Sequence, residues 1–573
     1  MKKSVIIWIT VSVFFFPGCT DVLEKYPLDT PSQETFWTSA IEIEKGINAC
    51  YSFLQETATD SYLFPLVLDG FTNIVYVREA AQAKTIAMGD HDDRTWEIVN
   101  TWMRAYQGIG RCNVMLKLIE EKGSLLTDVQ IKQFKGEALF LRAFYYMRLL
   151  FYFGDIPLLT SPIETVSEGM NLVRTSKDQV YQQVMNDFTE AAGLLEPRYS
   201  NNADIGRTTR GAANAYKARA ALYFGQYDVA AATARAVIES DVYQLYPKYG
   251  DLFVSTGLWD ANNREIILKK EYSAIINNYH TLPRVLQGRN PVGGYSSFVP
   301  SQQLVDSYYC IDGKNISESP LFDKANPFEN RDPRLQLSIV TPSSRFGDYQ
   351  YEVHIDSAFC WNYATETRVA NGNCYMASPI AVSHTGYLFR KYSDPSYVTK
   401  IAQGDYPVIL CRYAEVLLTY AEAKIELGQI DQSVINAINS VRRDRDDVKM
   451  PEYTLADFAD QNTARLKVRY ERKIELAFEG FRYLDLRRWG WANTYGNQPI
   501  LGRPFLGAYT DWPDVTFDVN GEPVYDYNNY EGHPSSDYRI VEQRRFTPGK
   551  HELWPIPQRD RNLNPELTQN PGF

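Results

Sequence analysis

Three glutamates with helical spacing are the first residues in this sequence that could carry out chemistry. Glu471, Glu475 and Glu479 recur every four residues, so a helix would place them on one side. Two carboxyl groups at the right separation are what a glycoside hydrolase requires. Arg469 and Arg472 are interleaved with the glutamates, however, and offer ion pairs along the same helix. We therefore predict a structural role for the three glutamates, with a glycoside hydrolase as the alternative.

The other residue types that commonly act in catalysis form no recognisable motif. The histidines are scattered, and the sequence contains no His-Glu-x-x-His pair, no Gly-x-Ser-x-Gly turn and no complete phosphate loop. Acidic clusters at 90–93 and 444–447 lack the spacing of a calcium loop, so we interpret both as solvated loops. The sequence thus predicts no catalytic residues, no metal site and no cofactor.

Aromatic residues are the more informative signal, because the chain contains 40 Tyr and 10 Trp. A sugar offers C–H faces that stack on aromatic rings and hydroxyl edges that bond to polar side chains. Aromatic and basic residues in or beside loops are therefore the candidates for ligand binding: Tyr76, Arg78, Trp96, Trp259, Tyr295, Trp361 and Tyr363. For each ring the alternative is that it packs its loop onto the scaffold. We assign Trp102, Tyr106 and Trp489 to the core.

The composition is that of an acidic globular protein. Of the 573 residues, 44% are hydrophobic and 23% are charged, which excludes wholesale disorder. The 59 Lys and Arg residues are outnumbered by 70 Asp and Glu residues, giving a net charge of −11. No binding of nucleic acid is therefore expected.

The N-terminus has the pattern of a secretory signal. Lys2 and Lys3 precede an apolar run at 5–16, which is too short to cross a bilayer, and the run is followed by Pro17, Gly18 and Cys19. We predict that residues 1–18 are cleaved and that Cys19 becomes the lipid-bearing first residue of a membrane-anchored protein. An ordinary signal peptide with a chance cysteine is the alternative.

Six further cysteines follow the predicted signal. Cys360 and Cys374 bracket a short loop and are the best candidates for a disulfide, which the predicted compartment would permit. The alternative is that all six are free, buried thiols.

Hydrophobic periodicity predicts a mainly helical chain. We expect helices at 38–54, 96–121, 127–153, 176–195, 211–224, 227–240, 413–427, 430–442 and 465–479. Ser176 is a plausible N-cap, and Pro197 lies just beyond the end of that helix. Segments 243–406 and 490–550 are rich in Gly, Pro, Asn and Tyr, which predicts loops, with short strands near 265–272 and 335–340.

Two of the expected helix pairs share a pattern of small residues around a glycine turn. Ala218 and Gly225 in one pair correspond to Ala421 and Gly428 in the other, at the spacing of tetratricopeptide repeats. The two glycines are 428 − 225 = 203 positions apart, so the repeats are not in tandem. We therefore predict a helical scaffold with long insertions rather than a simple solenoid.

Several motifs, in order along the chain, resemble the SusD/RagB family. The segments 136–146 and 153–157 are similar to its N-terminal half, and 469–482 with 485–490 resembles its late signature. The ending Leu553-Trp554-Pro555-Ile556-Pro557, followed by 564–565 and 569–573, resembles its C-terminus. The similarity spans nearly the whole chain.

This resemblance implies a fold and a function. Members are outer-membrane lipoproteins of Bacteroidetes that face outward, capture a glycan or sometimes a peptide, and cap a SusC-type TonB-dependent transporter without catalysis. The implied fold is mainly α, with tetratricopeptide-like helix pairs, long loop-rich insertions and a few short strands. We expect the signal at 1–18, an N-terminal helical region at 19–245 and a C-terminal region at 246–573 that carries the ligand-binding insertion, in one compact body. A peptide receptor on the same fold is an alternative.

Overall fold

A computed structural model describes residues 37–54, 64–78, 81–199, 204–377, 382–503, 514–526 and 539–573. The predicted signal and Cys19 lie outside the described residues. Within the described part of the chain, none of the helices combines the length and the apolar character needed to cross a bilayer.

The long helices lie where hydrophobic periodicity predicts them. The N-terminal part contains α2 (Ala40–Tyr51), α5 (Trp96–Lys122), α6 (Asp128–Phe153), α8 (Lys177–Leu194), α9 (Arg210–Tyr223) and α10 (Tyr227–Glu239), and the C-terminal part contains α16 (Tyr413–Glu426), α17 (Gln432–Arg443) and α18 (Gln461–Glu475). Side chains cap the helices, as the Ser176 hydroxyl does by accepting a hydrogen bond from the Gln179 amide at the start of α8. The capping residue predicted for this helix is therefore confirmed.

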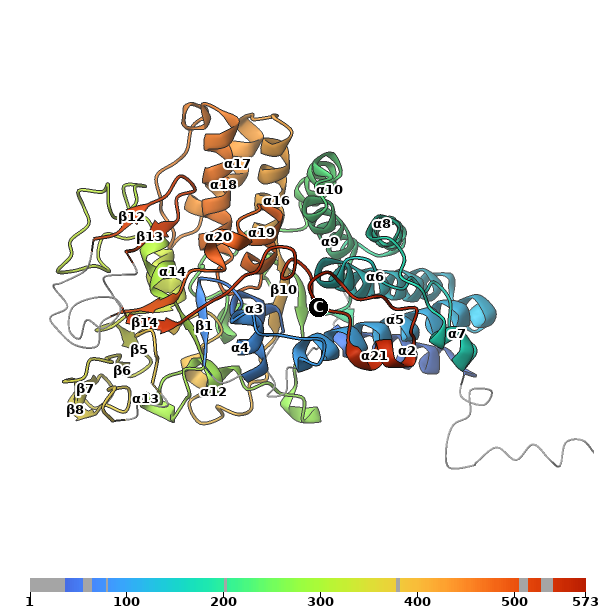
Figure 1. The fold of residues 1–573 in the computed structure, drawn as a ribbon, viewed down its shortest axis with the longest axis horizontal. Coiled ribbons are helices and arrows are strands. Elements are labelled where there is room, and N and C mark those ends of the chain that lie inside the picture. The colour runs from blue at the N-terminus through green and yellow to red at the C-terminus, as the bar shows by residue number, and fades with distance from the viewer. Residues whose placement is uncertain are drawn as a thin grey trace, which may run out of the picture.

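These helices form one array that is continuous in space although the chain leaves it and returns. Successive neighbours are α2 and α5, α5 and α6, α6 and α8, α8 and α9, α9 and α10, then α10 and α16, and α16 packs against both α17 and α18 (Figure 1). Each predicted repeat has a glycine in the turn between its two helices, Gly225 between α9 and α10 and Gly428 between α16 and α17. Both glycines have a positive φ, at +70° and +69°. The contact of α10 with α16 thus brings the two separated repeats together, and the predicted mainly helical fold class is confirmed.

The loop-rich insertion contributes short helices and strands at the other side of the molecule (Figure 1). The insertion holds α11 (Ser255–Leu258), α12 (Leu282–Leu286), α13 (Arg289–Val292), α14 (Gln302–Ser307) and α15 (Arg334–Ser338). Other short helices are α3 (Phe64–Asp69), α4 (Ala81–Ala87), α7 (Val166–Met170), α19 (Arg482–Arg488), α20 (Ala492–Tyr495) and α21 (Gln558–Leu563), of which α7 and α21 lie beside the long N-terminal helices in Figure 1. The strands are β1 (Val75–Val77), β2 (Ile266–Lys270), β3 (Phe298–Pro300), β4 (Ile339–Val340), β5 (Arg345–Phe346), β6 (Tyr349–Gln350), β7 (Phe359–Asn362), β8 (Thr367–Ala370), β9 (Leu388–Phe389), β10 (Val408–Arg412), β11 (Ile500–Gly502), β12 (Thr516–Phe517), β13 (Pro523–Val524) and β14 (Arg539–Glu542).

Two local predictions are wrong in their boundaries or type. The helix expected at 465–479 begins at Gln461, because the Asp460 carboxylate caps it, and ends at Glu475, before Phe478 adopts a φ of +62°. Most of the strand expected at 335–340 is instead helix α15, where the Asp332 side chain accepts a hydrogen bond from the Arg334 amide. Only Ile339 and Val340 are extended.

Buried ion pairs join α18 to the rest of the fold. Glu475 contacts Arg412 at 2.7 Å, Arg445 at 2.9 Å and Arg334 at 3.3 Å, and all four side chains are nearly or fully buried. Arg412 and Arg445 also contact Glu265, each within 2.9 Å. We call this group, together with the residues described next, the central ion cluster.

The cluster extends along the line of the predicted glutamates. Glu471 contacts Arg334 at 3.0 Å and also pairs with Arg442, while Glu479 contacts Arg412 and Lys391, each at 2.7 Å. The predicted structural role of the glutamates therefore agrees with these contacts, but their partners come from distant segments and not from the interleaved Arg469 and Arg472. Burial alone would raise the pKa of Glu475, yet Arg445, Arg412 and Arg334 lower it to about 2.

The described cysteines are buried, and each of the two acidic segments contains a buried side chain. The described cysteines, Cys50, Cys112, Cys310, Cys360, Cys374 and Cys411, are all free and buried, so Cys360 and Cys374 form no disulfide in this structure. The solvated loops predicted at 90–93 and 444–447 are in part wrong, because His91 and Arg445 are both almost completely buried.

His91 packs against a second histidine from the C-terminal segment. The ring centroids of His91 and His551 are 4.9 Å apart, and both rings lie near Phe573. Burial, the neighbouring imidazole and nearby cations lower the pKa of His91 to about 3. Burial together with Lys550 and Arg487 lowers the pKa of His551 to about 4. Both imidazoles are therefore neutral in the folded protein near pH 6.

We predict that Glu475→Gln destabilises the protein strongly, by about 3–5 kcal/mol, because it leaves buried guanidinium groups without their carboxylate. A large fall in melting temperature is the expected measurement. The matched control is Glu239→Gln, which breaks the exposed pair between Arg235 and Glu239 and should leave the melting temperature almost unchanged. Equal melting temperatures for the two variants would contradict the assigned role of the cluster.

We also predict that the free energy of unfolding falls as the pH is lowered from about 6.5 to about 4.5. The unfolded chain has histidine pKa values near 6.5, so it binds protons in this range while the folded protein does not. His551→Asn, which keeps an acceptor for the Thr547 amide, should make this dependence shallower without abolishing it, since His280 has a pKa of about 4 for the same reason of burial. Urea denaturation at several pH values measures the slope, and an unchanged slope would refute the explanation.

Candidate ligand-binding surface

Strands β5 to β8 form a small antiparallel sheet that presents one row of exposed side chains. The register pairs Arg345 with Gln350, and Trp361 with Arg368, while Tyr349 pairs with Asn362 and so places Gln350 opposite Trp361. Paired residues of an antiparallel sheet project from the same face. A tryptophan is therefore flanked by Gln350 on one side and Arg368 on the other, with Arg345 at the far end of the row.

A second aromatic side chain extends this row. Phe359 precedes Trp361 by two residues on β7, and the two are 57% and 37% exposed, whereas Cys360 and Asn362 between and beside them are buried. This alternation puts both rings on the same face of the strand. We call Phe359, Trp361, Gln350, Arg345 and Arg368 the β7 face. Sequence reasoning missed Phe359, although the alternation in Phe359-Cys360-Trp361-Asn362 is a signal that would have found it.

Tyr363 borders the β7 face. Its ring lies 4.8 Å from the Arg345 guanidinium, and its amide donates a 2.7 Å hydrogen bond to the Asp348 carbonyl. The side chain is half-buried, so its ring is partly occupied by this contact. Trp361 and Tyr363, predicted from the same loop-rich stretch, thus belong to one small sheet.

The loop that carries Tyr295 is tied to the sheet by Asn290. The Asn290 side chain donates a 3.0 Å hydrogen bond to the Ala370 carbonyl at the end of β8 and accepts one of 3.2 Å from the Gly372 amide. A Cβ at Gly372 would lie 2.7 Å from the Asn290 side-chain oxygen, so a side chain there would disturb this contact. The loop and the sheet are therefore held together.

Tyr295 itself is oriented by a neighbouring cation. The Arg284 guanidinium lies 4.5 Å from the centre of the Tyr295 ring and donates a 2.6 Å hydrogen bond to its hydroxyl. The Tyr295 amide also bonds to the Arg284 carbonyl. This half-buried ring is thus held in one position before any ligand arrives.

Arg78 and Tyr76 lie on and beside β1, which pairs with β3 just after the Tyr295 loop. The Arg78 amide donates a 2.8 Å hydrogen bond to the Ser297 carbonyl, so Arg78 lies beside that loop. The Tyr76 ring is only 3% exposed and stacks on His384 at 5.6 Å. Tyr76 therefore packs in the interior, and we leave it out of the surface that we propose to bind ligand.

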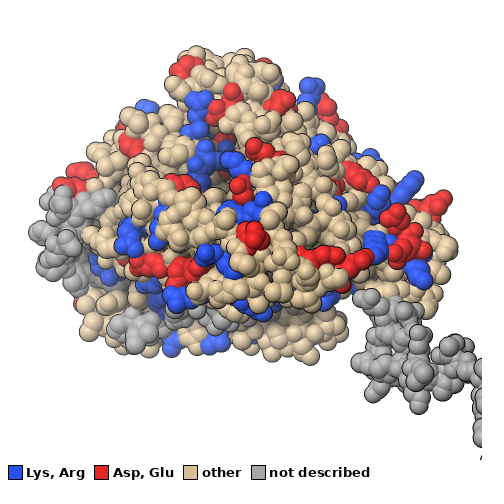
Figure 2. Space-filling view, turned by 45° about the vertical axis from the view of Figure 1, so that its right-hand side comes forward, with Lys and Arg blue, Asp and Glu red and all other residues tan. Residues whose placement is uncertain are grey.

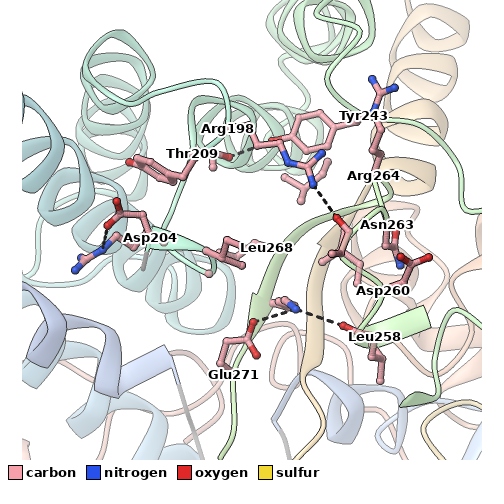
Figure 3. A pocket seen from close by; sticks show the side chains of 18 of the residues that line it. Arg198, Asp204, Thr209, Tyr243, Leu258, Asp260, Asn263, Arg264, Leu268 and Glu271 are labelled. Carbon is pink, nitrogen blue, oxygen red and sulfur yellow. Dashed lines mark hydrogen bonds and ion pairs between the residues drawn. The ribbon is translucent and has the colours of Figure 1, made fainter. Parts of the chain in front are cut away.

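The two remaining predicted residues lie elsewhere. Trp96 is the first residue of α5, and the nearby Asp93 carbonyl accepts a hydrogen bond from Gln558 at the start of α21. Trp259 follows α11 and lines a separate cavity of about 310 Å³ (Figure 3). The structure thus ties the Tyr295 loop, with Arg78 beside it, to the sheet that carries Trp361 and Tyr363, whereas Trp96 and Trp259 lie elsewhere.

The charges of the described residues form no metal centre. No group of three or more His, Cys, Asp or Glu side chains is arranged to hold a metal ion in the part of the chain that the structure describes. Basic and acidic side chains are interspersed over the face shown in Figure 2, which agrees with the similar numbers of each in the sequence.

The sequence matches two family models, one after the other. Residues 26–222 match a model described as "Starch-binding associating with outer membrane", and residues 264–573 match the model of the SusD family. The second match alone covers more than half of the chain. The chain therefore belongs to the SusD family, and the resemblance identified from its motifs is confirmed.

Individual relatives agree with this assignment. The chain is 25% identical over 510 residues to a SusD-like protein of Formosa agariphila. The aligned region covers 85% of this chain and 92% of that protein. It is 24% identical over 417 residues to the starch-binding protein SusD of Bacteroides thetaiotaomicron, covering 69% and 72% of the two chains. A crystal structure of a SusD-like carbohydrate-binding protein of Bacteroides fragilis superposes with a TM-score of 0.79 at 27% identity, covering 93% of this chain and all of the other.

Proposed function

We propose that this protein captures a glycan on the β7 face and passes it to a transporter without altering it. The observation that carries the proposal is an exposed tryptophan, Trp361, set between hydrogen-bonding side chains on a sheet. The ring stacks on the C–H face of a sugar, while Gln350 and Arg368 bond to its hydroxyls. Phe359 lengthens the aromatic row so that a neighbouring sugar residue stacks as well.

The Tyr295 loop adds a second edge to the proposed site. Tyr295 is fixed by Arg284, and Asn290 ties its loop to β8, so the ring and the β7 face keep their relative positions. A surface that is already ordered loses little conformational entropy when a ligand binds. The starch-binding and carbohydrate-binding relatives support the same class of ligand.

The central ion cluster argues against hydrolysis by the glutamates at 471, 475 and 479. Each carboxylate is buried and paired with cations, and a general acid or a nucleophile must reach its substrate. The carboxylate oxygens of these glutamates do not face solvent. A general acid needs a raised pKa, whereas the pKa values of Glu475 and Glu479 are lowered. We therefore propose a binding protein and not a glycoside hydrolase.

The location and the partner follow from the predicted lipoprotein signal and the family. We propose that Cys19 carries a lipid anchor in the outer membrane, that the folded part faces outward, and that a SusC-type TonB-dependent transporter receives the ligand. The family model described as associating with the outer membrane supports this placement.

We predict that Trp361→Ala weakens binding of the cognate oligosaccharide by roughly one to a few kcal/mol, because a stacking surface is lost. Tyr295→Ala should act in the same direction. Trp96→Ala is the matched control, since Trp96 has the same 37% exposure but lies at the start of α5. A glycan array followed by calorimetry on its best ligand measures the effect. Unchanged affinity in both site variants would reject this placement, and binding of peptides alone would reject the ligand class.

We further predict that the full-length protein co-purifies with a large outer-membrane transporter from detergent-solubilised membranes. Cys19→Ala should abolish membrane attachment, because the lipid chains bind to the membrane through their buried CH₂ groups. The measurement is the fraction of protein that pellets with outer membranes, together with mass spectrometry of what is retained. Repeated isolation without a transporter, or unchanged membrane attachment of the variant, would contradict the proposal.

A further inference from the structure

A second hollow lies between the helical scaffold and the loop-rich insertion. One wall comes from residues 198–199 and 204–209, between α8 and α9, and the other is the segment at 258–271, which includes β2 (Figure 3). Its volume of about 310 Å³ is at the lower end of the range for small-molecule sites, which is about 300–1,000 Å³. Junctions between structural units are also where such sites commonly occur.

Trp259 gives this cavity an aromatic wall. The indole lines the cavity and remains 49% exposed, which is more than Trp361 on the β7 face. The Lys269 ammonium lies 5.6 Å from the ring centre and donates a hydrogen bond to the Leu258 carbonyl. Trp259 is therefore placed at the wall by its neighbours but is not covered by them.

The charged groups of the cavity are nearly balanced in sign. Figure 3 shows Asp204 and Asp260 on opposite sides of the space. Glu271 forms an ion pair of 3.0 Å with Lys269. Arg207 is engaged by three carboxylates, from Glu44, Glu137 and Asp204, so its charge is neutralised. An anionic or cationic ligand would meet repulsion from part of this lining, whereas a neutral ligand would not.

Two groups at the rim offer a donor and an acceptor to a ligand. The exposed Arg198 guanidinium makes one long hydrogen bond, 3.4 Å to the Ala261 carbonyl, and its other N–H groups are available within the described part of the structure. The Asp260 carboxylate accepts from the Tyr246 hydroxyl and the Asn262 amide and has further lone pairs. Hydroxyl groups both donate and accept, so a polyhydroxyl compound suits this mixture.

We propose that this cavity is a second carbohydrate site, separate from the β7 face, that binds a neutral saccharide of one or two rings. The sugar stacks on Trp259, accepts hydrogen bonds from Arg198 and donates one to Asp260. The β7 face is open and accommodates a long chain from the side, whereas the cavity encloses a short sugar or a chain end. The assignment goes beyond the proposed function and does not depend on the β7 face.

The test uses the folded protein with Trp361→Ala, which disables the β7 face. Calorimetry and saturation-transfer NMR are carried out with maltose, laminaribiose, cellobiose and galactose, and with glucuronate as a charged comparison. We expect millimolar or tighter binding of at least one neutral sugar, and at least a roughly tenfold loss when Trp259→Ala is added. Adding Trp96→Ala instead should leave the affinity unchanged.

Arg198→Gln is the second variant, because Arg198 is exposed and a change there should not move the melting temperature. A roughly tenfold weaker affinity at an unchanged melting temperature supports direct contact with the sugar. The proposal would be overturned if none of the four neutral sugars bound, or if neither Trp259→Ala nor Arg198→Gln changed the affinity. Tighter binding of glucuronate than of the neutral sugars would overturn the ligand class. A wrong assignment of the β7 face would give a different result, because Trp361→Ala alone would then leave the binding of long glycans unchanged.

Discussion

The central ion cluster is the interaction on which the rest of this structure depends. Glu475 at the end of α18 contacts arginines that come from β10, from α15 and from the segment after α17. Lys391 donates to the carbonyl of Glu475, the last residue of α18, and to that of Ala477 just beyond the helix, where helix geometry supplies no amide partner. Charges removed from water are tolerated only when each has its partners. The cluster therefore specifies how the C-terminal helices and the insertion meet.

This junction lets a loop-rich insertion keep a defined shape. The helical array buries an extensive apolar core that includes residues from both the N-terminal and the C-terminal parts of the chain. A smaller apolar cluster joins Tyr76 of β1 to Phe346 and Tyr351 of the insertion, and through Phe346 on β5 it supports the sheet that carries Trp361. Both proposed binding surfaces are outside these cores: one on the sheet, the other where the scaffold and the insertion meet. The side chains that we propose to bind ligand are thus exposed on backbone that the two apolar cores support.

Two aromatic residues that the sequence predicts to bind ligand differ in burial in the structure. The sequence predicts ligand binding by both Tyr76, which follows a helical segment near Asp69 and Asn73, and Trp361, which lies in a loop before Gly372. Tyr76 is buried because β1 pairs with β3 of the insertion and packs into the smaller apolar cluster, whereas Trp361 is exposed because β7 turns that face toward solvent. Strand β1 is buried on both faces, so a different register would not expose Tyr76, whereas on β7 a shift by one residue would exchange the buried and the exposed face.

The sequence by itself determined the helices, the two repeats and the family. Those features depend on local periodicity, on turn glycines such as Gly225 and Gly428, and on motifs in order along the chain. Only the tertiary structure decided that the repeats adjoin through α10 and α16, that Glu475 pairs with Arg412, Arg445 and Arg334, and that Trp259 and Trp361 lie at different sites. These are contacts between segments far apart in the chain, and the side-chain spacing within any one segment carries no information about them.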